Sequence, residues 1–170
     1  MKHLIMAVMI ATLAVVATNA RANNITANID LIGGTALFGA VHTESSPVSS
    51  PFTDTFNFAI DGSVLANASL VTIGFNAGQD IDFLSATLNG HSLIIGGLFD
   101  GQYETALTLG NYSLLGPLQL IVTGTTDAGG GVSASYGGTL NVRSVPEPAS
   151  LMLLGAGLAG IGIWRRSMKV

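Results

Sequence analysis

The sequence predicts an all-β protein, with a single antiparallel β-sandwich similar to a jelly roll between an N-terminal signal peptide and a C-terminal transmembrane helix. The central region consists of short alternating or β-branched runs separated by Gly, Asn, Asp, Ser and Pro. None of these runs shows the apolar spacing of an amphipathic helix. Both ends of the chain carry longer apolar segments. We therefore divide the chain into residues 1–22, 23–144 and 145–170.

The N-terminal segment has the pattern of a secretory signal peptide. It begins with Lys2, continues as an apolar run over 4–17, and ends in small residues around Arg21. Ala20 and Ala22 form the A-x-A pattern that signal peptidase cleaves. We expect cleavage after Ala22 and export of the chain.

The central region contains nine candidate strands. In residues 55–61, Phe56, Phe58 and Ile60 alternate with smaller or polar residues, as in a strand with one buried face. No stretch between the runs is long enough for crossover helices, which favours antiparallel pairing. The candidate strands are residues 24–32, 35–42, 55–61, 69–77, 82–89, 91–97, 103–109, 117–126 and 135–144.

Two turn signals define the boundaries between runs. Asn89 and Gly90 lie between two strand-like runs and predict a hairpin, because both residues tolerate positive φ. Pro47 and Pro51 predict a loop or an edge crossing over 44–51, because proline cannot donate a hydrogen bond within a central strand.

Composition excludes several classes of function. The chain has no cysteine, so disulfides, thiolate metal sites and cysteine nucleophiles are impossible. Residues 23–144 contain one basic side chain, Arg143, and nine acidic ones, a difference of −8. Such a domain has almost nothing with which to neutralise phosphates, so nucleic acid and anionic lipid surfaces are poor partners.

The histidines of this region carry no catalytic pattern. His91 follows the predicted turn, and His42 ends a strand before a polar loop. No nucleophile elbow or zinc-protease motif accompanies either residue. We therefore expect no catalytic residues and no enzymatic activity.

Two aspartates are the main candidates for a metal site, to which the loop acids Asp61, Asp100 and Asp127 could add ligands. Asp80 and Asp82 are two residues apart, which places both on one face of a strand, where their oxygens suit Ca²⁺. A lone pair of this kind is also common on solvated acidic surfaces. Carboxylate pairs also serve glycoside hydrolysis, at a separation that a sequence does not reveal. We expect no cofactor, with Ca²⁺ as the alternative.

The C-terminal segment predicts a short membrane helix. Residues 150–164 are uncharged and would extend about 23 Å as a helix, against a bilayer core of about 30 Å. Arg165 and Arg166 follow directly, and the positive-inside rule places them in the cytoplasm with the β domain outside.

The order Pro146, Glu147, Pro148, apolar helix, Arg165 and Arg166 resembles the PEP-CTERM sorting signal. The resemblance implies a Gram-negative bacterial protein whose Pro-Glu-Pro motif is recognised by an exosortase, a membrane-embedded cysteine transpeptidase. It implies transient anchoring in the inner membrane, removal of the tail, and delivery to the cell surface or an exopolysaccharide matrix.

A second resemblance lies in residues 51–58. Phe52, Asp54 and Phe56 match the F-x-D-x-F motif of a PEP-CTERM subgroup, which implies a β-rich domain and no known activity. We expect Phe52 and Phe56 to pack inward, with Asp54 on the same face or capping a turn.

Two hypotheses of function follow. The first is a non-enzymatic surface or matrix protein that associates with exopolysaccharide or with itself in a biofilm. The alternative is a secreted carbohydrate-active enzyme, or a calcium-dependent carbohydrate-binding module, that uses aspartate side chains. The absence of a nucleophile or metal motif from the sequence favours the first.

Overall fold

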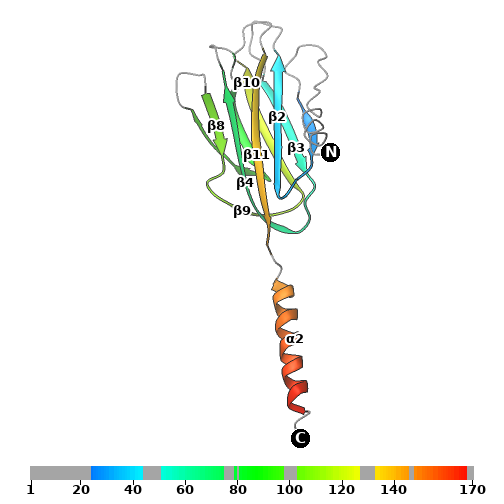
Figure 1. The fold of residues 1–170 in the computed structure, drawn as a ribbon. Helices are drawn as coiled ribbons and strands as arrows, with labels where there is room; N and C mark the ends of the chain where they lie inside the picture. Colours follow the sequence, from blue (N-terminus) through cyan, green and yellow to red (C-terminus); the bar gives the residue numbers. More distant parts are fainter. Residues whose placement is uncertain are drawn as a thin grey trace, which may run out of the picture.

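The protein, represented by a computed structural model, is built mostly of β-strands (Figure 1). The structure describes residues 24–43, 51–74, 79, 81–97, 103–126, 133–145 and 148–167. The signal peptide expected at 1–22, with Ala20 and Ala22, lies outside these residues. Within them, eleven strands form two sheets and one helix follows, so the all-β prediction is confirmed.

The two sheets contain five and six strands. The five-stranded sheet has the order β1 (Thr26–Ile29), β3 (Pro51–Phe58), β10 (Leu118–Thr126), β5 (Ile81–Leu88) and β6 (His91–Ser92). The six-stranded sheet has the order β2 (Thr35–Thr43), β11 (Ser133–Ser144), β4 (Ser63–Ile73), β8 (Tyr103–Leu107) and β7 (Ile94–Gly97), and β9 (Tyr112–Leu115) also pairs with β4.

The prediction of a purely antiparallel sandwich is wrong in one place, because β1 runs parallel to β3. The strand between them in sequence, β2, belongs to the other sheet. The chain therefore crosses to the second sheet and returns, and it re-enters the first sheet in its original direction. The other strand pairs in the described sheets are antiparallel.

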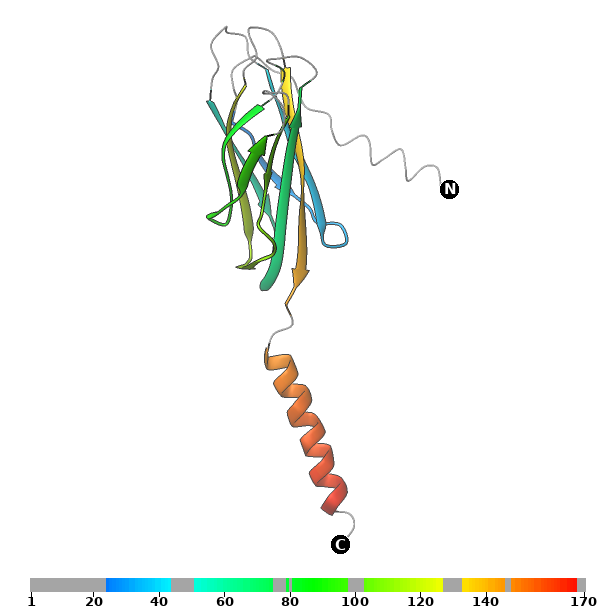
Figure 2. The same ribbon diagram turned by 90° about the vertical axis from the view of Figure 1, so that its left-hand side faces the viewer.

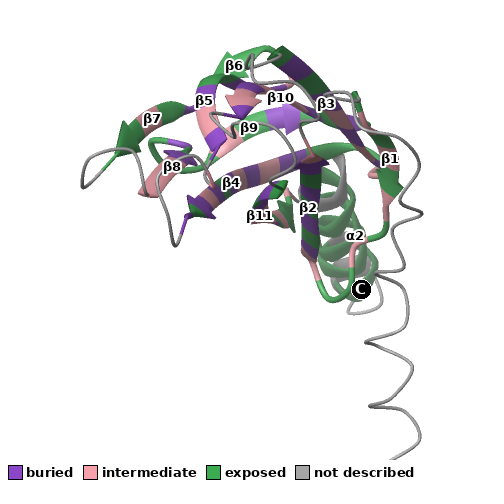
Figure 3. Cartoon of the chain, turned by 90° about the horizontal axis from the view of Figure 1, so that it is seen from above, coloured by how far each residue is buried: buried purple, intermediate pink, exposed green. Residues whose placement is uncertain are grey.

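One hydrophobic core lies between the sheets. Buried and exposed residues alternate along their strands (Figure 3), as the period of two in the sequence predicts. The ring centroids of Phe38 in β2 and Phe56 in β3 are 5.0 Å apart, so the sheets contact each other directly. The largest fully buried apolar side chains are Phe52, Phe56, Phe58, Val64, Leu70, Ile81, Leu88, Leu118, Leu120 and Leu140.

The predicted hairpin at Asn89 and Gly90 is confirmed. Their φ angles are 47° and 81°, and Leu88 pairs with His91 across the turn. The Asn89 side chain accepts a hydrogen bond from the Gln119 backbone at 2.6 Å and donates to the backbone oxygen of Pro117 at 3.2 Å. Asn89 therefore also holds the start of β10 in place.

Two strands begin well before their predicted starts. β3 begins at Pro51, which proline permits because the first residue of a strand need not donate to the ladder. β4 begins at Ser63 rather than residue 69, and its first half pairs with the unpredicted β9. The first half of β4 was not predicted because it contains small residues such as Ala66 and Ala68, although both lie in the core.

Gly138 in β11 is required by packing. A Cβ at this position would lie 2.4 Å from the Ser69 backbone oxygen and 2.7 Å from Cζ of Phe38. We expect Gly138→Ala to destabilise the protein by about 1–3 kcal/mol, because the Ser69 backbone oxygen cannot move aside as a flexible side chain can. Thermal and urea unfolding measure the effect.

The neighbouring glycine supplies a matched control. A Cβ on Gly137 would meet only the Phe38 backbone oxygen at 3.7 Å, an ordinary contact. Equal losses in Gly137→Ala and Gly138→Ala would contradict the packing explanation.

Helix α2 (Pro148–Ser167) extends away from the strands (Figure 2). Within the described part of the chain, no helix has both the length and the apolarity needed to cross a membrane, so the transmembrane helix predicted over 150–164 is not shown. Four glycines and the terminal Arg165 and Arg166 lower the hydropathy of α2.

Candidate functional site

The C-terminal helix is the first candidate site. Pro148 is its first residue, where a fixed φ suits a helix start and the missing N–H goes unused. Arg165 is exposed near its end, and Arg166 also belongs to the helix. Pro146 and Glu147 lie outside the described residues. The helix therefore starts within the predicted Pro-Glu-Pro motif and ends beyond the predicted arginines.

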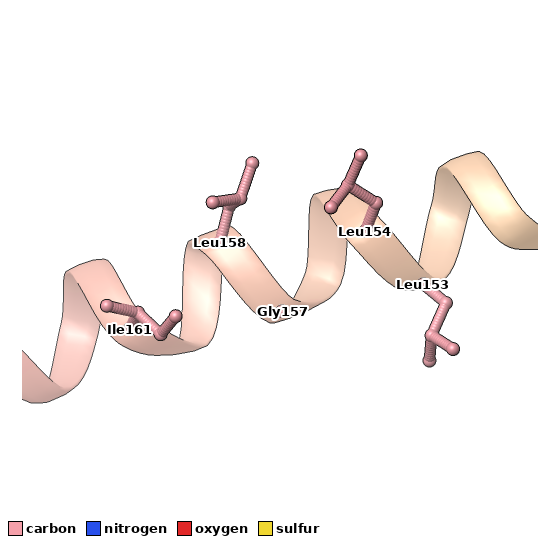
Figure 4. A pocket seen from close by; sticks show the side chains of 5 residues that line it. All are labelled: Leu153, Leu154, Gly157, Leu158 and Ile161. Atoms are coloured by element: carbon pink, nitrogen blue, oxygen red, sulfur yellow. The ribbon is translucent and has the colours of Figure 1, made fainter.

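The large apolar side chains of α2 that the structure describes are exposed, among them Leu153, Leu154, Leu158 and Ile161, which Figure 4 draws. Leu153 projects to the opposite side from Leu154 and Leu158 (Figure 4), and the shallow apolar groove that these side chains line includes Gly157. No described atom lies within 4 Å of a Cβ built on any of the four glycines, leaving out the backbone of the helix itself. Small residues at such positions allow another helix to approach closely.

The F-x-D-x-F stretch forms the second candidate site. Phe52, Asp54 and Phe56 lie on the inward face of β3 and are 1%, 0% and 1% exposed. The period of two places all three on one face. Asp54 is therefore a carboxylate inside the hydrophobic core, where a charge without partners is strongly disfavoured.

Asp54 accepts hydrogen bonds from three groups. Its Oδ2 accepts from Nε2 of His42 at 2.8 Å and from the hydroxyl of Tyr136 at 2.6 Å. Its Oδ1 accepts from the backbone N–H of Ile25 at 2.8 Å. When Asp54 is ionised, its oxygens only accept, and Nε2 of His42 is then the donor to Oδ2. We call Asp54, His42 and Tyr136 the buried triad.

The buried triad connects both sheets. Asp54 lies in β3 of the five-stranded sheet, and His42 and Tyr136 lie in β2 and β11 of the six-stranded sheet. Ile25 directly precedes β1, so the same carboxylate also holds the N-terminal strand. One side chain thus joins four segments that are distant in the sequence.

Aromatic rings enclose the buried triad. The ring of Phe52 stacks on His42 with centroids 3.7 Å apart and planes 14° apart. Phe56 and Phe83 meet Tyr136 edge-on at 6.3 and 5.5 Å. Burial, with the adjacent Asp54 carboxylate, raises the pKa of Tyr136 far above its ordinary value.

This environment determines what the buried triad can do. His42, Asp54 and Tyr136 are 2%, 0% and 4% exposed, so a substrate has no access to them. The geometry is that of a satisfied polar cluster that connects strands. His42 lies at the end of a strand, as predicted, but its burial was not predicted; it continues the inward alternation of Ala36, Phe38 and Ala40.

Of the other predicted site residues, those that the structure describes include Asp82 and His91. Asp82 lies between buried Ile81 and Phe83 in β5 and is half-buried, and Asp80 lies outside the described residues. His91 is exposed, with its ring centroid 5.2 Å from that of Tyr112. Among the residues that the structure describes, no group of three or more His, Asp or Glu side chains is arranged to hold a metal ion.

Comparison with known proteins identifies the C-terminal segment. Residues 144–167 match the family described as the PEP-CTERM protein-sorting motif, so that resemblance is confirmed, whereas the F-x-D-x-F subgroup is not. No curated protein matches the chain. A similar solved structure is PliG of Salmonella Typhimurium, a periplasmic inhibitor of g-type lysozyme, with 10% identity and a TM-score of 0.34 over 71% of this chain and 100% of that one.

Proposed function

We propose that this chain is a non-enzymatic surface or matrix protein, delivered outside the cell by exosortase-type processing of its C-terminal segment. The match of residues 144–167 to the sorting motif carries the proposal. That motif indicates an exported protein whose sorting includes a membrane-associated step. The exposure of α2 supports the same role, because a processing enzyme needs an accessible segment.

The β domain supports a structural role. Its histidine–carboxylate pair is sealed inside the core, where it connects strands. Hydrogen-bonded rows of neutral side chains cover part of the outer face of the six-stranded sheet, such as Thr35 to Asn141, Asn141 to Asn67 and Asn67 to Asn111. A polar and uncharged face of this kind suits a hydrated polysaccharide environment.

We also assign the domain to the jelly-roll class of β-sandwich. Strands β2, β3, β4 and β5 alternate between the two sheets, and the first and last long strands, β2 and β11, are neighbours. Strands that alternate between two facing antiparallel sheets are typical of Greek-key sandwiches and jelly rolls.

The sorting proposal predicts a shortened extracellular protein. We expect the extracellular form in the native host to begin at Asn23 and end near residues 146–148, and the membrane fraction to contain the uncleaved precursor. Intact mass with C-terminal peptide mapping of both fractions measures this. Replacing Pro146, Glu147 and Pro148 together by alanine should keep the chain full-length in the membrane fraction.

A matched variant tests whether the motif itself matters. Asp61→Ala removes an exposed carboxylate of the β domain and should leave processing unchanged. If extracellular molecules of the unaltered protein all retain Trp164 and Arg165, the sorting proposal fails. Release of sugars from the host exopolysaccharide by the purified protein would contradict the non-enzymatic role.

A further inference from the structure

The edges of the two described sheets differ in length. Four of the five edge strands are short: β1, β7 and β9 have four residues each, and β6 has two. The fifth, β2, has nine residues and pairs only with β11 among the described strands. Long edge strands present unpaired backbone groups to other chains, and proteins ordinarily protect them.

The residues of β2 themselves carry none of the usual protective features. Residues 35–43 contain no Pro, Lys, Arg, Asp or Glu, and the register with β11 has no bulge. Its outward face presents the apolar side chains of Leu37 and Val41, which are 73% and 45% exposed. An uncharged and unbulged edge with exposed apolar residues favours strand addition.

The outward row of β2 is self-complementary. It has the order Thr35, Leu37, Gly39, Val41 and Thr43, which is nearly symmetric about Gly39. If two β2 strands pair antiparallel about Gly39, each Leu37 faces a Val41 and each Thr35 faces a Thr43. Apolar and Thr–Thr cross-strand pairs both stabilise a sheet.

The centre of the row also suits a two-fold axis. A Cβ on Gly39 would lie 2.6 Å from the Tyr136 backbone oxygen, so packing within the chain keeps this position free of a side chain. The two glycines would meet with no side chain between them. Although the domain is acidic, no carboxylate of β2 would face another.

We propose that β2 is a self-association edge, at which a second copy of this chain pairs antiparallel about Gly39 and extends the six-stranded sheet across both copies. Such an interface is isologous, because the same surface serves both partners. The proposal rests on the proposed function only in treating the domain as a matrix component.

Disulfide trapping tests the register, since the natural chain has no cysteine. In the proposed pair, Leu37 and Val41 of the second copy would have Cα atoms about 4.5–5.5 Å apart, which a disulfide can bridge. Two copies of Leu37 would lie about 13 Å apart, which a disulfide cannot bridge. We expect a mixture of the full-length Leu37→Cys and Val41→Cys variants to form mainly the mixed dimer under mild oxidation.

Two controls make the outcome decisive. Leu109→Cys, which is 78% exposed and outside β2, reports random collision. Equal cross-linking in mixed and single-variant samples, or no excess over Leu109→Cys, would overturn the proposal. Association through α2 alone would give one of these two overturning results. The assay uses the unprocessed full-length chain, so a failure of the sorting proposal is distinguishable from a failure of this one.

Sedimentation of the full-length chain provides a second test. We expect Val41→Lys to abolish the dimer, because two lysines would enter an apolar strand pair. Ile73→Lys, at a 59% exposed position of β4 in the same sheet, should leave the dimer intact. A dimer that survives Val41→Lys would overturn the proposal.

Discussion

Asp54→Ala is expected to destabilise the domain by about 3–5 kcal/mol, because each buried donor left without an acceptor costs about 1–3 kcal/mol. The substitution leaves the His42 ring, the Tyr136 hydroxyl and the Ile25 N–H without their acceptor inside the core. Small domains have about 5–15 kcal/mol of stability in total, so this loss is large. Circular dichroism during urea unfolding measures it; tryptophan fluorescence is unsuitable because the only tryptophan is Trp164 in α2.

A graded series keeps this test informative if the alanine variant does not fold. Asp54→Asn retains one amide oxygen as an acceptor and should lose less stability than Asp54→Ala. Asp30→Ala removes an exposed carboxylate and should change stability by no more than about 0.5 kcal/mol. If Asp54→Ala is as mild as Asp30→Ala, the buried triad does not hold the sheets together.

Stability is expected to fall steeply at alkaline pH because of Tyr136. Its pKa is raised in the folded protein by burial and by Asp54. Below the unfolded pKa of about 10, the phenol is neutral in both states and its contribution is fully present. At higher pH only the unfolded chain releases this proton, so stability falls by about 1.4 kcal/mol per pH unit until the folded pKa is reached.

Tyr136→Phe isolates this contribution. The variant should lose about 1.5–3 kcal/mol near neutral pH, since its hydrogen bond to a charged acceptor disappears. Its unfolding free energy should then depend less on pH above about pH 10 than that of the natural protein. Tyr112→Phe, which removes a hydroxyl bonded to the Ser92 backbone oxygen, should keep the original dependence. Identical alkaline profiles for Tyr136→Phe and the natural protein would contradict the assignment.

Several features of the fold could be predicted because they depend on neighbouring residues. Alternation of side chains along a strand is a local property, and it correctly placed Phe56 and Phe58 in the core. The turn at Asn89 and Gly90 was predictable for the same reason, since positive φ favours these residue types. Half of β4 was not predicted because two of its three inward residues, Ala66 and Ala68, are alanines, whose burial depends on what covers them.

Of the two candidate sites, one could be predicted from neighbouring residues and the other only in part. The order of Pro-Glu-Pro, apolar run and arginines is contiguous, so the sorting segment was visible in the sequence and matches the family at 144–167. Strand periodicity could predict the inward position of Asp54 between Phe52 and Phe56. Its partners were not, since His42, Ile25 and Tyr136 are 12, 29 and 82 residues from it.

The sequence alone therefore determined the β class, the main turn, the faces of the strands and the sorting segment at the C-terminus. Tertiary structure decided the parallel pairing of β1 with β3, the exposed edge of β2 and the partners of Asp54. The physical reason is that periodicity and turn propensity act between adjacent residues. Strand order and buried polar contacts depend instead on strands that are distant in the sequence. The favoured arrangement is the one that leaves the fewest buried polar groups without a partner when the two sheets pack over one core.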